Sequence, residues 1–307
     1  MRTALLAITD ELRRLKGAGV KSVAVSDESL AALRTVVRRR LEVGGGREET
    51  IPATLKTLVP PAVVAPKISV LPPPTSNLPP LSTLPPPPVV TLPAGDKATR
   101  WNALLELVRN DPVCRAQVRP GKQVVLGVGN LDAKIMFVGE APGAEEEVQG
   151  EPFVGPAGQL LTKMIGAMGL ARGDVYIGNI MNWRPQLPTA AGATQIGNRP
   201  PTEEEMRYCL PYLRAQIEVV NPALLVALGS TAAQGLLGFG SFKALGEIRG
   251  LWREFAGTPL LVTYHPSYIL RSQSNRSKRM IWEDLLKVME RAALPISEKQ
   301  RSYFLDK

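Results

Sequence analysis

Three polar loops of this sequence carry the side chains that could do chemistry. They are the segments 139–158, 179–201 and 265–279. The first places a carboxylate, Glu140, in a glycine-rich turn, and the third begins with His265, the only histidine of the chain. Carboxylates and imidazoles are the groups that proteins use to move protons and to stabilise charge in a transition state. The first loop matches neither the phosphate-binding P-loop nor the dinucleotide-binding motif, so its glycines indicate close backbone approach to some other ligand.

Alternating strands and helices must position these loops. Apolar runs predict four strands, at 134–139, 174–181, 223–228 and 260–264. Apolar residues at helical spacing predict helices at 99–109, 156–170, 202–220, 230–237 and 276–292. Thr202 and Glu205 have the spacing of a capping box, and Ser230 has the type of an N-cap. The pattern indicates an α/β fold with a buried parallel sheet, in which ligands bind at the carboxyl ends of the strands.

Composition limits the class of protein. The 307 residues include 37 Lys and Arg against 28 Asp and Glu, a net charge of +9 that favours a polyanionic partner. Two cysteines and one histidine cannot fill a usual structural zinc site or a four-thiolate iron–sulfur site. No apolar run reaches the roughly 20 residues of a membrane helix, and the apolar start is too short for a signal peptide. We therefore expect a cytoplasmic protein that is not attached to a membrane. We further expect it to be a monomer that associates with the bacterial nucleoid.

The prolines divide the chain. Fourteen of the 28 lie between Pro52 and Pro93, which predicts an extended linker at 44–98. The linker is either a passive spacer or a docking site for a partner that reads PxxP segments. A small helical module precedes it at 1–43, where Arg38–Arg40 either form a solvated face or contact nucleic acid. A globular domain follows at 99–293, and a flexible tail at 294–307.

Five sequence blocks together carry a resemblance to a known family. They are Gly139-Glu-Ala-Pro-Gly143, Pro152-Phe-Val-Gly-Pro-Ala-Gly158, Tyr176-Ile-Gly-Asn179, Val226-Ala-Leu-Gly229 and Tyr264-His-Pro-Ser-Tyr268. In this order and at this spacing they resemble the uracil-DNA glycosylase superfamily, and most closely its family 4. The resemblance covers about residues 100–293. It implies a three-layer α/β/α sandwich with a central four-stranded parallel sheet, and hydrolysis of the bond between uracil and deoxyribose in DNA to leave an abasic site.

The resemblance also implies which residues bind the base. Phe153 matches the position that stacks on uracil, unless it is a core phenylalanine. Asn179 matches the position that reads the base edge, where its amide would accept from N3–H and donate to O4. Cytosine presents the reverse pattern and would leave the amide unpaired. His265 would donate to uracil O2 as negative charge builds there, although a lone histidine is often structural. The backbone of Ala141 and Gly143 would line the same pocket.

Glu140 is the only carboxylate that the first motif offers for catalysis. Ala141 occupies the position at which the best-known branch of the superfamily has an aspartate. Glu140 would orient the attacking water or support a cationic sugar, as carboxylates do in glycoside hydrolysis, or it has a structural role in the turn.

The segment after His265 is expected to enter DNA. By family position Ile269 or Leu270 would be an apolar wedge that fills the gap left by the flipped base, unless both pack under the loop. The cations that follow, Arg271, Arg276 and Lys278, would bind phosphates.

One family feature is incomplete in this chain. Family 4 usually holds a 4Fe–4S cluster on four cysteines, and the corresponding positions here are Asp111, Cys114, Trp183 and Cys209. We therefore predict that no cluster, metal or other cofactor is bound. The loop 182–201 contains no histidine, so the covalent trapping known in another branch is not expected.

Two further expectations concern partners and base preference. Gln300 followed by Tyr303 and Phe304 faintly resembles a bacterial sliding-clamp peptide. The main alternatives to uracil excision are a shifted preference for another deaminated base, such as hypoxanthine, and a catalytically weak protein that binds DNA lesions.

Overall fold

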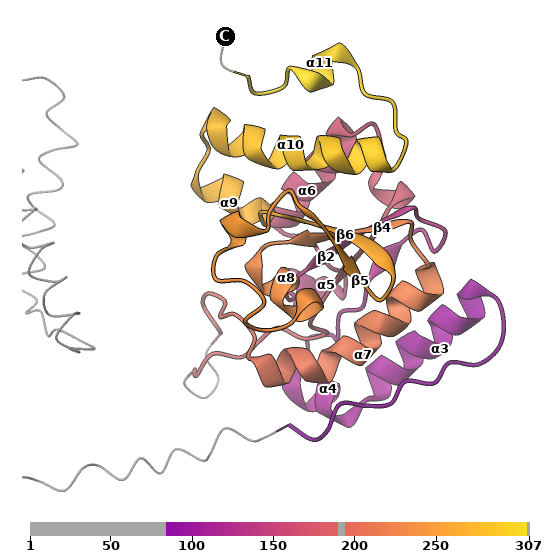
Figure 1. The fold of residues 1–307 in the computed structure, drawn as a ribbon. Helices are drawn as coiled ribbons and strands as arrows, with labels where there is room; N and C mark the ends of the chain where they lie inside the picture. The colour runs from indigo at the N-terminus through magenta and orange to yellow at the C-terminus, as the bar shows by residue number, and fades with distance from the viewer. Residues whose placement is uncertain (1–83, 190–193, 306–307) are drawn as a thin grey trace, which may run out of the picture. The chain divides into compact units, whose positions relative to one another are not determined.

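The computed structural model describes residues 84–189 and 194–305, which form an α/β domain around one six-stranded sheet. The strand order is β1-β3-β2-β4-β6-β5. The four inner strands run parallel, and they are β3 (Tyr176–Asn179), β2 (Ile135–Gly139), β4 (Leu224–Leu228) and β6 (Thr258–Thr263). The predicted central parallel sheet is confirmed (Figure 1).

Two edge strands were not predicted. They are β1 (Val128–Gly129) and β5 (Trp252–Phe255), and both pair antiparallel to their neighbours. A strand of two residues has no readable pattern, and β5 is largely solvent-exposed, so neither shows the apolar run of a buried strand. A two-residue turn joins β5 to β6, with Ala256 and Gly257 at φ angles of 48° and 81°. Positive φ at both positions is what a tight hairpin requires.

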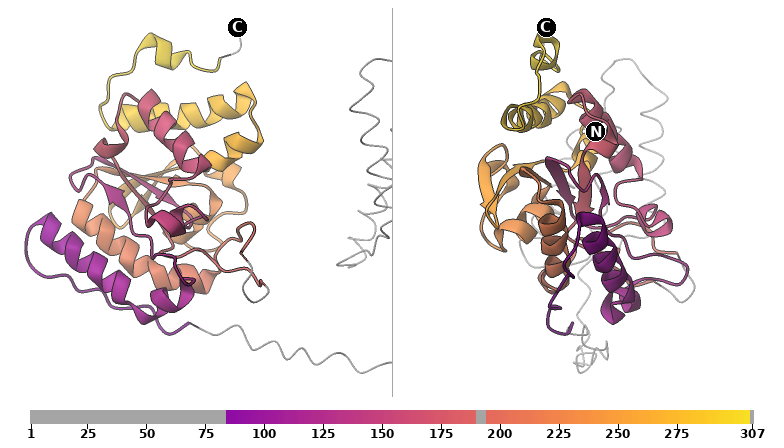
Figure 2. Two further views of the ribbon diagram at one scale, coloured as in Figure 1. Left: turned by 180° about the vertical axis from the view of Figure 1, so that it is seen from behind. Right: turned by 90° about the vertical axis from the view of Figure 1, so that its right-hand side faces the viewer.

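Helices cover both faces of the sheet (Figure 2). Met136 and Val138 of β2 face one core cluster, whereas Ile135 and Phe137 face the other, as the period of two in a strand demands. The helices of the first cluster are α3 (Lys97–Asn110), α4 (Pro112–Gln117), α7 (Glu203–Val220) and α8 (Ser230–Leu237). Those of the second are α6 (Pro156–Ala167), α9 (Pro266–Arg271) and α10 (Asn275–Arg291). The predicted three-layer sandwich is thereby confirmed.

Several predicted element ends shift for local reasons. The capping box of Thr202 and Glu205 at the start of α7 is present as predicted. Helix α6 ends at Ala167, two residues before Gly169 adopts a φ of 85°. The N-cap of α8 is Gly229 and not Ser230, which is already the first helical residue. Three short elements lie between the larger ones, α5 (Glu146–Gln149), η2 (Arg172–Asp174) and η3 (Leu245–Glu247).

The ends of the domain differ from the composition-based boundaries. Leu84, Val90 and Leu92 belong to the predicted linker, yet they pack against the first core cluster. The predicted flexible tail instead contains helix α11 (Glu298–Arg301), which is tied to α10: Trp282 Nε1 donates to the Gln300 carbonyl at 2.6 Å. Composition did not show these contacts because they join residues distant in the sequence.

The predicted helical module at 1–43, with Arg38–Arg40, and the linker up to residue 83 lie outside the described residues. No helix in the described part of the chain is long and apolar enough to cross a membrane.

Candidate active site

The carboxyl ends of the parallel strands open into a cavity of about 700 Å³. Strand register aligns these ends, since Gly139 pairs with Asn179 and Leu228 with Thr263. The cavity is lined by seven of the predicted site residues, Glu140, Ala141, Gly143, Phe153, Asn179, His265 and Arg271. The three loops picked out in the sequence therefore meet. A fourth wall, formed by the turn after β4 at 229–231, was not predicted.

His265 is held in one orientation as the N-cap of α9. Its Nδ1 atom accepts the Ser267 backbone N–H at 3.2 Å and lies 2.8 Å from the Ser267 hydroxyl. Because Nδ1 accepts, a neutral ring carries its proton on Nε2. Burial, aided by the nearby charge of Arg271, lowers the pKa of His265 to about 4. The geometry supplies a neutral hydrogen-bond donor at physiological pH.

Phe153 lies beside this imidazole. The two ring centroids are 5.6 Å apart, and the phenyl group is only 6% exposed. The Phe153 backbone has a φ of 57°, which is uncommon for a bulky residue and is found most often where function requires the strain. At Gly158 a Cβ atom would lie 1.8 Å from the Phe153 carbonyl oxygen, so this turn needs glycine there.

Asn179, at the end of β3, presents an unsatisfied acceptor. Its side chain is 6% exposed, and its Oδ1 has no hydrogen-bond partner among the described residues. An unpaired buried polar atom typically costs 1–3 kcal/mol, so such atoms are rare unless a ligand satisfies them. The atom belongs to a cavity-lining residue, and this placement supports the predicted role in reading a base edge.

Because Gly139 has no side chain, it leaves space for the side chains of Phe153 and Asn179 to lie close to it. A Cβ atom at Gly139 would lie 2.4 Å from Asn179 Oδ1 and 2.5 Å from the Phe153 ring. We expect Gly139→Ala to lower kcat/KM for base release by about 10²-fold, because displacing reacting groups by about 1 Å has effects of that size. Single-turnover kinetics on a uracil-containing oligonucleotide measures this. Gly166→Ala is the matched control, since a Cβ there meets no atom of the described residues within 4 Å. An equal loss in both variants would contradict the steric argument.

Glu140 is half-buried at the carboxyl end of β2. Burial raises the pKa of Glu140, and a hydrogen bond from Thr231 opposes the rise. Thr231 lies in the unpredicted fourth wall of the cavity. A carboxylate with a raised pKa in a cavity is well placed to accept a proton from water.

Sequence reasoning missed Glu146 as a residue that organises the site. Its Oε2 accepts the Gly143 N–H at 3.1 Å, and its Oε1 accepts the N–H groups of Val154 and Gly155 at 3.0 and 2.9 Å. One carboxylate thus ties together the two halves of the loop on either side of Phe153. The sequence signal was only an acidic run at 145–147, which is usually a solvated surface.

The predicted DNA wedge divides into one buried and one exposed residue. Ile269 is 9% exposed and packs in the second core cluster, which favours for this residue the alternative of packing under the loop. Leu270 is 41% exposed. Arg271 is exposed and lines the cavity, whereas Arg276 and Lys278 lie at the start of α10 outside the cavity wall. The orientation of the six-residue helix α9 places Ile269 in the core and Leu270 at the surface.

The residues at the four family cysteine positions do not fit an iron–sulfur cluster. Trp183 is fully buried and fills space in the first core cluster. The Asp111 carboxylate already accepts the Cys114 N–H at 2.6 Å and the hydroxyls of Tyr208 and Tyr212 at 2.8 Å each. Cys114 and Cys209 are the only two cysteines of the chain, and both are fully buried, so ligation by four thiolates cannot be completed. No group of three ligating side chains occurs in the described residues.

We expect the purified protein to contain no iron. Elemental analysis measures this directly, and several iron atoms per chain would refute the interpretation of the Asp111 and Trp183 positions.

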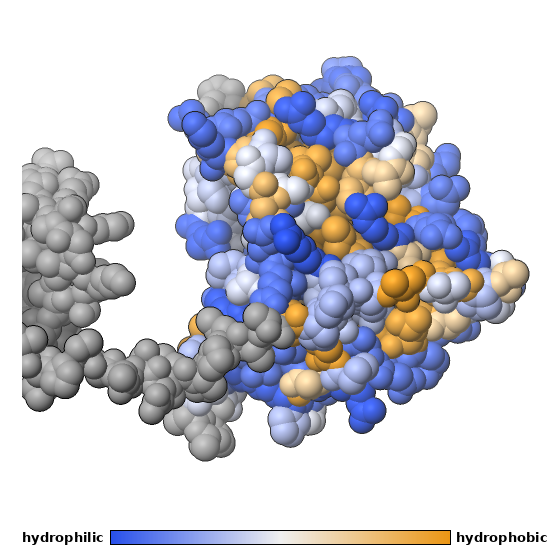
Figure 3. Space-filling view, turned by 60° about the horizontal axis from the view of Figure 1, so that its bottom comes forward, coloured by the Kyte–Doolittle hydropathy of each residue, from blue (hydrophilic) through white to orange (hydrophobic). Residues whose placement is uncertain are grey.

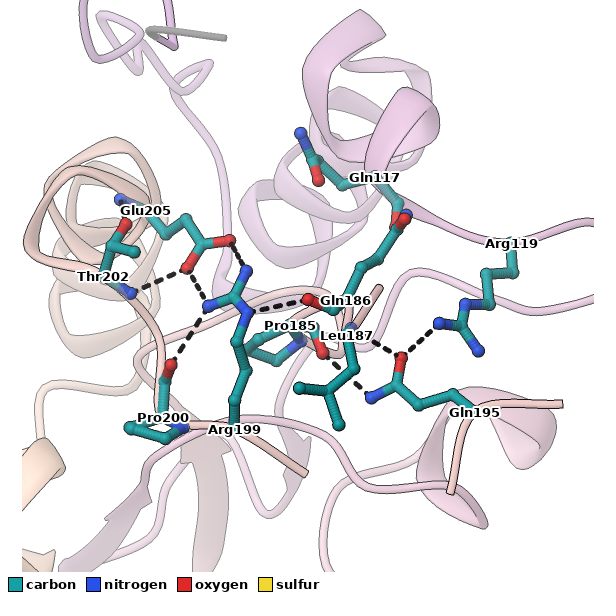
Figure 4. Close-up of polar contacts among 10 residues, drawn as sticks. All are labelled: Gln117, Arg119, Pro185, Gln186, Leu187, Gln195, Arg199, Pro200, Thr202 and Glu205. Atoms are coloured by element: carbon teal, nitrogen blue, oxygen red, sulfur yellow. Dashed lines mark hydrogen bonds and ion pairs between the residues drawn. The ribbon is translucent and has the colours of Figure 1, made fainter. Parts of the chain in front are cut away.

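The loop after β3 is held by polar contacts instead (Figure 4). The Arg199 guanidinium binds both carboxylate oxygens of Glu205, at 2.7 and 2.6 Å, and donates to the Gln186 carbonyl at 2.7 Å. The amide of buried Gln195 donates to the Pro185 carbonyl and accepts from the Leu187 N–H, both at 3.1 Å. These contacts fix the segment that carries Asn198 to the cavity wall.

Comparison with known proteins assigns the class. A sequence model of the Uracil DNA glycosylase superfamily matches residues 126–286, and the chain belongs to this superfamily. Within it, the chain is similar to proteins named type-4 uracil-DNA glycosylase. The relative from Thermotoga maritima is 44% identical over 165 residues, which cover 53% of this chain and 80% of the relative. The relative from Pyrobaculum aerophilum is 39% identical over 57% of this chain and 87% of the relative.

A type-5 uracil-DNA glycosylase from the same Pyrobaculum species is 30% identical over 54% of this chain and 73% of the relative. This identity is lower than the 44% and 39% of the two type-4 relatives, so family 4 fits this chain, in agreement with the resemblance found in the motifs.

Proposed function

We propose that this protein is a uracil-DNA glycosylase that hydrolyses the bond between uracil and deoxyribose and leaves an abasic site for base excision repair. The single observation that carries the proposal is the unpaired Oδ1 of Asn179 in a cavity that also holds Phe153 and the neutral imidazole of His265. The type-4 names of the relatives support the same activity.

In this proposal each side chain has a distinct task. The nucleotide leaves the base stack, and uracil lies against the Phe153 ring. Asn179 Oδ1 accepts from uracil N3–H, while the amide nitrogen donates to O4. As the bond between C1′ and N1 breaks, negative charge moves into the base and strengthens the hydrogen bond from His265 Nε2 to O2. A water directed by Glu140 then adds to C1′ and gives up a proton to the Glu140 carboxylate.

The test is an excision assay on oligonucleotides that contain uracil or hypoxanthine, as single and as double strands. Release of uracil and of no other base supports the proposal. Release of hypoxanthine at a comparable rate would favour the alternative of a shifted base preference. Tight binding without base release would favour a lesion-binding protein.

The raised pKa of Glu140 gives the pH profile a predicted shape. If the ionised carboxylate directs water, kcat rises with pH through a pKa that lies above the usual glutamate value of 4.5. His265 does not contribute to this limb in the neutral range, since its own pKa is about 4. Glu140→Gln should remove the limb and lower kcat. An unchanged acid limb in this variant would assign the titration to another group.

DNA is the partner that the proposal requires. The sliding-clamp contact is not supported, because the Gln300 side chain is occupied within the domain: it donates to the Ala167 carbonyl at 2.9 Å. A monomeric state and action on DNA in the cytoplasm stay predictions, which sedimentation and fractionation would test.

A further inference from the structure

A second basic surface lies away from Arg271. Its centre is a hollow of about 360 Å³ beside α4, and it is lined by four cations, Arg109, Arg115, Arg119 and Lys122. No carboxylate from the described part of the chain lines it. Figure 1 shows α4 at the lower side of the domain. Figure 3 brings this side forward, and mainly hydrophilic residues lie along the lower edge of the domain in that view.

The cations of this hollow are poorly neutralised by the protein. Within residues 84–189 and 194–305, the ion pair of Arg109 with Glu106 is a distant one, at 4.0 Å. Arg115 and Lys122 form no ion pair with any described residue, and Arg119 contacts the neutral amide of Gln195. Four like charges around one hollow raise the local positive potential, which attracts an anion of matching extent.

Two loop segments, 145–148 and 195–198, connect the hollow to the catalytic cavity. On one side, Gln123 donates from its backbone to the Glu147 carbonyl at 2.7 Å and from its side chain to the Val148 carbonyl at 2.9 Å. The adjacent residues Glu145 and Glu146 line the catalytic cavity.

On the other side, Arg119 binds Gln195, and Gln195 in turn donates to the Gly197 carbonyl at 3.2 Å. The next residue, Asn198, lines the catalytic cavity. Each of these two segments therefore contacts a residue of the hollow and contains a residue that lines the catalytic cavity.

Each of these two segments also carries an exposed apolar side chain. Val148 is 50% exposed and Ile196 is 91% exposed. Leu270 lies on the other side of the cavity, since α9 follows β6 whereas the Ile196 loop follows β3, and β2 and β4 lie between these strands. The cavity thus has an exposed apolar residue on each flank and cations beyond each.

We infer that the DNA strand carrying the target nucleotide continues from the cavity across Val148 and Ile196 and places its phosphates in the basic hollow. Cations along the backbone path are a recurring element of a single-strand binding surface. The aliphatic side chains of Val148 and Ile196 offer the bases apolar contact in place of aromatic stacking. This inference rests on the proposed function for the position of the target nucleotide. It assigns a footprint to one side of that nucleotide that Arg271, Arg276 and Lys278 do not serve.

The test uses the double variant Arg115→Ala/Lys122→Ala on single-stranded substrates of opposite asymmetry. One oligonucleotide extends about ten nucleotides to the 5′ side of the uracil and the other about ten to the 3′ side, while a minimal one lacks both extensions. We expect kcat/KM to fall about 10-fold for only one of the two asymmetric oligonucleotides, with kcat and the minimal substrate unaffected. The salt dependence of binding should weaken by about 1.4 in log–log slope, from two lost phosphate contacts.

The matched control is Lys134→Ala/Arg253→Ala, which removes the same charge from exposed positions before β2 and on β5. An equal loss for both asymmetric oligonucleotides, or the same loss in the control, would overturn the inference in favour of general electrostatic attraction. Failure of the proposed function is distinguishable, because the salt slope is also measured on oligonucleotides without uracil. A reduced slope there without any base release would retain the surface and reject the activity.

Cross-linking provides a second measurement that does not depend on the double variant. Cys114 and Cys209 are both fully buried, so Ile196→Cys offers one accessible thiol in the described domain for a photoreactive maleimide. We expect cross-links to the nucleotides on the same side of the uracil that the asymmetric substrates identify. Cross-links to the opposite side, or none at saturating DNA, would overturn the inference.

Discussion

Replacement of His265 by alanine is expected to lower kcat for uracil release by about 10²–10³-fold, the usual effect of removing a donor to developing negative charge. KM should change little, because the hydrogen bond from Nε2 matters most when the base carries charge. Single-turnover kinetics separates this chemical step from product release. A loss confined to KM would show that the imidazole binds uracil without stabilising its departure.

The same residue affects stability in a predictable direction. The pKa of His265 is lowered from 6.5 to about 4 on folding, so the unfolded chain binds its proton first as the pH falls. The neutral His265 imidazole therefore makes its full contribution to the free energy of unfolding above pH 6.5, and this contribution is lost as the pH falls towards 4. Ser267→Ala is the control for this pH dependence of stability, since it keeps the titrating imidazole and removes only the hydroxyl beside Nδ1.

Asn179→Ala should have the second large effect, a loss of about 10²–10⁴-fold in kcat/KM for uracil, because two hydrogen bonds to the base are removed in a desolvated site. Folding stability should not fall by more than about 1 kcal/mol, since Oδ1 has no hydrogen-bond partner to lose within residues 84–189 and 194–305. Excision kinetics and denaturant unfolding of the same sample test both statements. Unfolding at much lower denaturant would show instead that Asn179 is a structural residue of the strand end.

The sequence was sufficient for the parts of the fold that depend on local pattern. Buried parallel strands are nearly all apolar, so β2 and β4 were visible as runs, and the loops that follow such strands meet at one sheet edge. The positions of Phe153, Asn179 and His265 in one cavity follow from that rule together with the motifs.

The parts that could not be predicted depend on contacts between distant residues. Glu146 reads as one of three consecutive acids, and only the folded loop shows that its carboxylate accepts three backbone N–H groups. The choice between Ile269 and Leu270 depends on the rotation of one short helix, which a single apolar pair does not fix. Asp111 occupies a position at which the family has a cysteine, and the sequence did not show its structural role. That role depends on hydrogen bonds from Tyr208 and Tyr212, which lie about a hundred residues away.

The packing of α11 determines where this domain can be shortened. Arg279 donates to the carbonyls of Arg301 and Tyr303, at 2.7 and 2.9 Å, and the Tyr303 ring covers Trp282 with a centroid distance of 5.2 Å. A chain truncated at residue 293 would leave the Trp282 indole and the Arg279 guanidinium without these partners. The newly exposed surface would favour non-specific association with other molecules. A truncated protein for crystallisation should therefore retain residues up to at least 305, and affinity tags belong beyond that point.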